Sequence, residues 1–115
     1  MIQVEPRPKQ LKGETVKIKV GCGNLYITIN KHEGKVFEVF AKLGKSGGCN
    51  ACQLEALSRS ISLGLRAGIE LNEYCEHLEN LKCLTPSLDE GNQISSCPDA
   101  IAQVLRNFIP KKEGV

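Results

Sequence analysis

The stretch Ser-Ser-Cys-Pro-Asp-Ala at residues 95–100 predicts the start of a helix and carries a single cysteine. Ser96 or Cys97 suits the N-cap position, and Pro98 suits the first helical position. Asp99 places a negative charge in the first turn, where the helix dipole favours it. Beyond it, apolar residues recur with the spacing i, i+3, i+4, i+7, namely Ile101, Val104, Leu105 and Phe108. This pattern predicts an amphipathic helix up to Ile109.

The position of Cys97 at this helix start is chemically informative. The positive end of a helix favours a thiolate, so we expect a metal ligand or a reactive sulfur here. The chain has six cysteines. Single cysteines are often small buried hydrophobic residues, but six in one chain of a reducing compartment indicate metal binding or redox chemistry.

Length and composition indicate a single domain and limit the kinds of partner that we expect. A chain of 115 residues is long enough for one domain, and 15 basic against 13 acidic residues give a net charge of +2. This balance gives no argument for a nucleic-acid or membrane partner. No apolar run approaches the roughly 20 residues that span a bilayer, and the first residues lack a signal-peptide stretch. We therefore expect a cytoplasmic protein.

Alternating apolar and polar residues predict three consecutive strands. The first covers Thr15 to Val20, with a solvated lysine face formed by Lys17 and Lys19, and the others start near Leu25 and Val36. Tight turns separate the strands, the first of them around Cys22. Residues 1–13 are interpreted as an extended leader, residues 14–109 as the domain and residues 110–115 as a tail.

Two further helices are expected before the Cys97 helix. One follows Gly48 and ends at Gly68, and the other runs from an Asn72 cap to Leu81. Residues 88–94 are interpreted as a polar loop. The whole pattern predicts an α+β fold in which a three-stranded antiparallel meander packs against three helices in two layers.

Four cysteines fall at breaks between these elements, namely Cys22, Cys49, Cys83 and Cys97. Breaks at the same end of a two-layer fold converge, and four thiolates suit zinc or an iron–sulfur cluster. The expected domain is therefore metal-stapled. Cys75 and His77 have no partner at metal-ligand spacing and are interpreted as structural or exposed.

A competing interpretation uses Cys49 and Cys52, a Cys-x-x-Cys pair between a strand and a helix. Such a pair is typical of thioredoxin-like redox motifs, although the preceding strands do not form a βαβ unit. The alternative function is a small thiol-disulfide protein. Redox chemistry needs Cys52, whereas a four-thiolate site does not.

The segment from Gly44 to Gly48 contains the Gly-Lys-Ser of a phosphate-binding loop. That motif also needs a glycine at position 39, where the chain has Val39. We interpret the segment as a flexible connector, with nucleotide or anion binding there as an open question.

Ordered motifs along nearly the whole chain resemble the TSCPD domain, found at the C-terminal end of adenosylcobalamin-dependent (class II) ribonucleotide reductases and as short stand-alone proteins. The matching pieces include Arg7-Pro8, the run from Gly21 to Asn30, Phe37 to Phe40, Leu43 to Cys49, and Ser96 to Ile101. Ser95 stands in place of the eponymous threonine.

The resemblance implies a metal at the positions of Cys22, Cys49, Cys83 and Cys97, with Cys52 and Cys75 as additions. It also implies deoxyribonucleotide synthesis, but the family's radical chemistry belongs to a large barrel that 115 residues cannot contain. No cobalamin pocket and no complete active site are therefore expected. The implied role is an accessory or detached module whose partner is a class II ribonucleotide reductase catalytic subunit.

Overall fold

The computed structural model describes residues 2–44, 48–84 and 86–109, without the side chains of residues 48–50. Its elements follow the order β1-β2-β3-α1-α2-β4-β5-α3. The expected α+β fold, with a three-stranded antiparallel sheet and three helices, is confirmed. The predicted tail at residues 110–115 lies outside the described residues.

The sheet is a meander of β1 (Lys12–Val20), β2 (Gly23–His32) and β3 (Lys35–Leu43). Every second side chain points to the core, because successive residues of a strand face opposite sides. Positive φ angles of 52° at Glu33 and 80° at Gly34 form the tight turn between β2 and β3. The three strands are longer than the alternation alone predicted.

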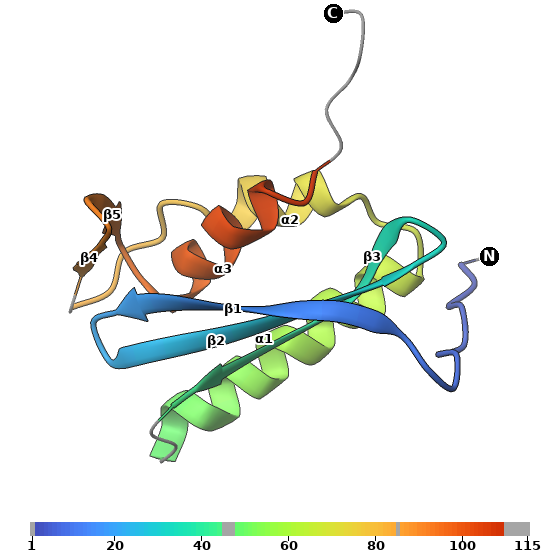
Figure 1. Cartoon of the computed structure of the whole chain (residues 1–115), viewed down its shortest axis with the longest axis horizontal. Helices are drawn as coiled ribbons and strands as arrows, with labels where there is room; N and C mark the ends of the chain where they lie inside the picture. Colours follow the sequence, from blue (N-terminus) through green and yellow to red (C-terminus); the bar gives the residue numbers. More distant parts are fainter. Residues whose placement is uncertain (1, 45–47, 85, 110–115) are drawn as a thin grey trace, which may run out of the picture.

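Helix α1 (Gly48–Arg66) runs alongside β3, at the edge of the sheet (Figure 1). Ser62 Oγ accepts a 3.0 Å hydrogen bond from the Val39 N–H and donates one to the Val39 carbonyl. Ser58 Oγ accepts a 2.9 Å bond from the Ala41 N–H. These two serines, one helical turn apart, therefore satisfy backbone groups that an edge strand leaves open.

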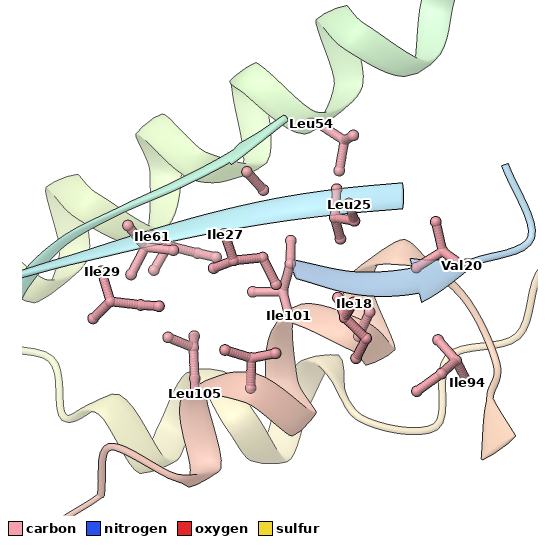
Figure 2. Close-up of a cluster of buried hydrophobic side chains, with 14 of the residues drawn as sticks. Ile18, Val20, Leu25, Ile27, Ile29, Leu54, Ile61, Ile94, Ile101 and Leu105 are labelled. Atoms are coloured by element: carbon pink, nitrogen blue, oxygen red, sulfur yellow. The ribbon is translucent and has the colours of Figure 1, made fainter. Parts of the chain in front are cut away.

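The core lies between the sheet, α1 and α3 (Cys97–Arg106) (Figure 2). Ile101 and Leu105 of α3 are fully buried, as the apolar spacing of that helix predicted. They join a cluster in which each side chain is at most 8 % exposed, including Leu25, Ile27, Ile29, Leu54 and Ile61. This packing fixes α3 against β1 and β2.

Helix α2 (Leu71–Leu78) packs against α3 and ends three residues earlier than predicted. Its N-cap is Glu70, without a side-chain cap bond, so the expected Asn72 cap is wrong. Beyond the helix, Asn80 has a positive φ of 65°, a conformation that stops a right-handed helix. The chain then turns toward the start of α3.

The expectation of a polar loop at residues 88–94 is also wrong. Two short antiparallel strands, β4 (Ser87–Asp89) and β5 (Asn92–Ile94), form a hairpin there. The Asp89 carboxylate accepts a 2.8 Å hydrogen bond from the Lys19 N–H, which ties the hairpin to β1. Ile94 is 1 % exposed and anchors the hairpin in the core.

Candidate functional site

The start of α3 is built around Ser96 and Asp99. Ser96 is the N-cap, and its side chain accepts a 3.1 Å hydrogen bond from the Asp99 N–H. Pro98 lies within the first turn, where its missing N–H costs no helical hydrogen bond. Cys97 is consequently the first residue of the helix.

Asp99 is 2 % exposed and joins three separate parts of the chain. Its carboxylate accepts hydrogen bonds of 2.7 Å from the Asn80 N–H, 2.9 Å from the Ser95 N–H and 2.9 Å from the Gln103 side chain. The sequence pattern assigned Asp99 only a helix-dipole role. Nothing in the periodicity indicates the bond to Asn80, which lies in the segment between α2 and β4.

Cys83 is positioned by the same motif. Its backbone N–H donates a 3.0 Å hydrogen bond to the Ser95 carbonyl. Ser95 is itself held by Asp99, so the segment carrying Cys83 lies beside the start of α3. Two of the predicted ligand positions thus share one local framework.

Cys22 lies in the two-residue turn between β1 and β2, because Val20 pairs directly with Gly23. Gly23 has a φ of 128°, which a residue with a side chain rarely adopts. The turn therefore depends on glycine at this position. It presents Cys22 at the end of the sheet.

The thiols of Cys22, Cys83 and Cys97 come together at this end. The pKa of Cys97 is raised to about 11, first by burial, then by electrostatic interaction with Cys22 and Cys83 and by a hydrogen bond with Cys22. The prediction that this position favours the Cys97 thiolate is wrong, because these effects outweigh the positive end of the helix. Three cysteine thiols from three distant segments nevertheless interact at this end of the sheet.

The backbone of Cys49 lies in the first turn of α1, and its side chain is outside the described residues. Gly44 donates a 2.9 Å hydrogen bond to the Asn24 carbonyl, so β3 ends beside the turn that carries Cys22. Helix α1 begins four residues later, at Gly48. Among the side chains that the structure describes, no group of three or more His, Cys, Asp or Glu is arranged to hold a metal ion.

The two remaining cysteines differ in their surroundings. Cys52 is exposed on α1, whereas Cys75 is completely buried in α2. Burial is the main cause that raises the pKa of Cys75. Cys75 is thus structural, and the side chain of His77 is exposed, as the sequence predicted for these two residues. The possible anion loop at residues 45–47 lies outside the described residues.

A second polar cluster connects the predicted leader to the sheet. Arg7 donates hydrogen bonds of 2.9 Å to both carboxylate oxygens of Glu38, and Asn30 donates a third of 2.7 Å. Burial alone would raise the pKa of Glu38, but these hydrogen bonds and the charges of Arg7 and Arg66 lower it below its usual value. Sequence reasoning missed this pair, because Glu38 occupies a polar position of the strand alternation and Arg7 lies 31 residues away.

Comparison with known proteins gives one family. The model of the TSCPD domain matches residues 2–109. The chain is 27% identical over 108 residues to a vitamin B12-dependent ribonucleotide reductase of Streptantibioticus cattleyicolor, with 90% of this chain and 18% of that protein covered. It is 29% identical over 106 residues to the protein of the same name in Agrobacterium fabrum, with 90% and 8% covered.

The chain therefore spans less than a fifth of the length of these relatives. No solved structure gives a significant match. Within the described residues, no helix has the length and apolar character needed to cross a membrane.

Proposed function

Since this chain belongs to the TSCPD domain family, we propose that it is a metal-stapled accessory module of a vitamin B12-dependent ribonucleotide reductase. The observation that carries the proposal is the meeting of Cys22, Cys83 and Cys97 at one end of the sheet. On this proposal the module stabilises or docks to a catalytic subunit in the cytoplasm and performs no reaction alone.

The chemistry of the donor set fits a soft metal. Thiolates are the ligands that zinc prefers in closed structural sites, and they also hold iron–sulfur clusters. Cys22, Cys83 and Cys97 would supply three ligands, and Cys49 would supply the fourth. Binding a cation would reverse the electrostatics of the thiol cluster, because a metal deprotonates the thiols that coordinate it.

Support for the accessory role comes from the relatives. The reductases of Streptantibioticus cattleyicolor and Agrobacterium fabrum each contain a segment that resembles almost this whole chain. More than four fifths of each of those proteins lies outside this segment. We infer that the present chain serves the same machinery in deoxyribonucleotide synthesis, whether it acts alone or within a longer polypeptide.

The test is metal content by mass spectrometry on anaerobically purified protein. We expect about one zinc ion or one cluster per chain, reduced several-fold in C22S, C49S, C83S and C97S. The matched control is C52S, which replaces an exposed cysteine of α1 and should retain the metal. Metal-free wild-type protein, or equal loss in C52S, would contradict the metal site.

The accessory role is tested separately by mixing the chain with a purified B12-dependent reductase catalytic subunit that lacks this segment. Co-elution on size exclusion is the expected result. Failure to associate at concentrations of tens of micromolar would remove the accessory role and leave the metal site intact.

A second candidate function remains a thiol-disulfide protein that uses Cys49 and Cys52. The observation that favours it is the exposure of Cys52 near the start of α1, where an attacking thiol needs access. This function predicts a measurable dithiol potential that survives in C22S and C83S. Loss of that redox couple in either variant would argue against it.

A further inference from the structure

The sheet has one face packed on the core, and no helix or strand among the described residues covers the centre of its other face, where Tyr26 and Phe40 are exposed. Arg7 of the leader lies over Glu38 at one end of that face. The open face is formed by alternate residues of the three strands, opposite in direction to Ile18, Ile27 and Val39. Its centre consists of two rows across the strands: Lys17, Tyr26 and Lys42, and then Thr15, Thr28 and Phe40. We propose that this open face binds single-stranded nucleic acid.

Aromatic side chains are the first observation. The chain has only two tyrosines and three phenylalanines. The two that are exposed, Tyr26 at 38 % and Phe40 at 45 %, both lie on the open face. They are diagonal neighbours on adjacent strands, since Thr28 is paired with Phe40 and Tyr26 with Lys42. Exposed rings on an antiparallel sheet provide surfaces on which unpaired bases stack.

Charge is the second observation. Lys17 and Lys42 flank Tyr26 on both sides, and Lys19 continues the row of lysines along β1. The carboxylate on this side of the sheet belongs to Glu38, which is 3 % exposed and neutralised by Arg7. At the margin, Asp89 is bonded to the backbone of β1. The open face is therefore positive, which complements a phosphate backbone.

A groove extends the open face past the edge of β3. Phe40 and Lys42 line one side of a cavity of about 410 Å³, and Ser58, Arg59 and Glu55 of α1 line the other, where Arg59 and Glu55 form a 2.8 Å ion pair. Pockets of about 300–1,000 Å³ hold small organic ligands, so this groove has room for one unstacked base. Phe40 and Lys42 of the open face are therefore also lining residues of this groove, and Lys42 is the lysine among them.

The near-balanced composition of the whole chain does not reveal the positive charge of the open face. A net charge of +2 averages the whole chain, whereas the strand alternation sorts lysines and exposed rings onto one side. Unlike the metal-site proposal, this inference uses none of the cysteines. The two proposals therefore succeed or fail independently.

The experiment is fluorescence anisotropy with a labelled 12-nucleotide oligothymidylate, its RNA equivalent and a duplex of the same length. We expect preference for the single strands and a loss of affinity with rising salt. In K17Q/K42Q the slope of log K against log salt should fall by about 0.7 per lost phosphate contact. The matched control is K12Q/K35Q. It removes lysines from the same two strands, at positions where the strand alternation directs side chains away from the open face.

The aromatic contribution is tested with Y26L/F40L, which keeps apolar bulk but removes the flat rings. We expect at least about ten-fold weaker binding of single strands at 100 mM salt, because base stacking on aromatic rings supplies much of such affinity. Thermal unfolding of each variant checks that the sheet is intact. Unchanged affinity in Y26L/F40L, equal binding of duplex, or equal effects of K12Q/K35Q and K17Q/K42Q would overturn the proposal. Binding of a protein partner through this face, with no oligonucleotide bound, would overturn it as well.

Discussion

The buried carboxylate of Asp99 accepts a 2.7 Å hydrogen bond from the backbone N–H of Asn80, which links the first turn of α3 to the segment after α2. The same carboxylate holds the Ser95 N–H, and Ser95 in turn accepts a hydrogen bond from Cys83. One side chain thus connects the segments that carry Cys83 and Cys97.

Replacing Asp99 with asparagine should therefore destabilise the fold. An amide group turns one acceptor into a donor that faces backbone N–H groups, and a buried donor without a partner costs about 1–3 kcal/mol. Urea unfolding should show a loss of about 2 kcal/mol or more. Asp89→Asn is the control, since its carboxylate accepts one exposed backbone bond and should cost about 1 kcal/mol or less.

Gly64 in α1 should not tolerate alanine. A Cβ atom at Gly64 would collide with the Tyr74 hydroxyl of α2 and lie 2.8 Å from its Cζ. Glycine-to-alanine changes in helices normally stabilise by about 1 kcal/mol, but here we expect a loss of about 1–3 kcal/mol from overpacking. In G64A/Y74F the loss should shrink because the hydroxyl is gone. A melting temperature of G64A above that of wild type would contradict this packing.

The serines that cover the edge of β3 give a third prediction. S62A leaves the Val39 N–H and carbonyl without their side-chain partner, and S58A does the same to the Ala41 N–H. Each should cost about 1–3 kcal/mol, and the double variant should aggregate faster on heating because its strand edge is open. Ser60 is exposed on the same helix, so S60A should change the melting temperature little.

Acid should weaken the Arg7–Glu38 pair. The folded pKa of Glu38 is lower than its unfolded value of about 4.3, so the unfolded chain takes up the proton first as pH falls. The stabilisation from this pair is complete above the unfolded pKa and is lost as pH drops through the folded pKa. Urea midpoints between pH 7 and 3.5 should fall less steeply in R7M than in wild type. R59M, which breaks an exposed i, i+4 pair, should follow the wild-type slope.

Thiol titration distinguishes the metal-bound from the metal-free chain. Cys22, Cys52 and Cys83 are exposed, and Cys75 is completely buried. With a metal on the four proposed ligands, only Cys52 should react rapidly with a thiol reagent, and C52S should remove this fast phase. Without metal, Cys22 and Cys83 should react as well. Three fast thiols in protein of full metal content would contradict the ligand assignment.

The sequence predicted the regular parts of the fold because they depend on local periodicity. Alternation identified three strands, and the apolar spacing after Asp99 identified α3. It missed the β4–β5 hairpin, because strands of three residues such as Ser87–Asp89 are too short for a periodic signal. It also missed the Arg7–Glu38 pair, since a bond between residues 31 positions apart leaves no local pattern.

The candidate site was predictable only in part. The family resemblance and the element breaks selected Cys22, Cys49, Cys83 and Cys97, and the structure brings three of them together. The pKa of Cys97 was predicted to shift in the wrong direction, because the helix start favours a thiolate and the pKa is raised instead. Helix position can be derived from local sequence, whereas burial and the presence of two further thiols depend on the tertiary fold.

The convergence of Cys22 with Cys97 also determines when the site forms during synthesis. Cys22 leaves the ribosome early, whereas α3 is the last element of the described domain to appear. At roughly 5–20 residues per second, the sheet and α1 wait several seconds for their final helix. On the proposed metal site, Cys22 would therefore be synthesised before Cys83 and Cys97, the ligands that complete the site. The proposed site would thus be completed only after the last helix has been made.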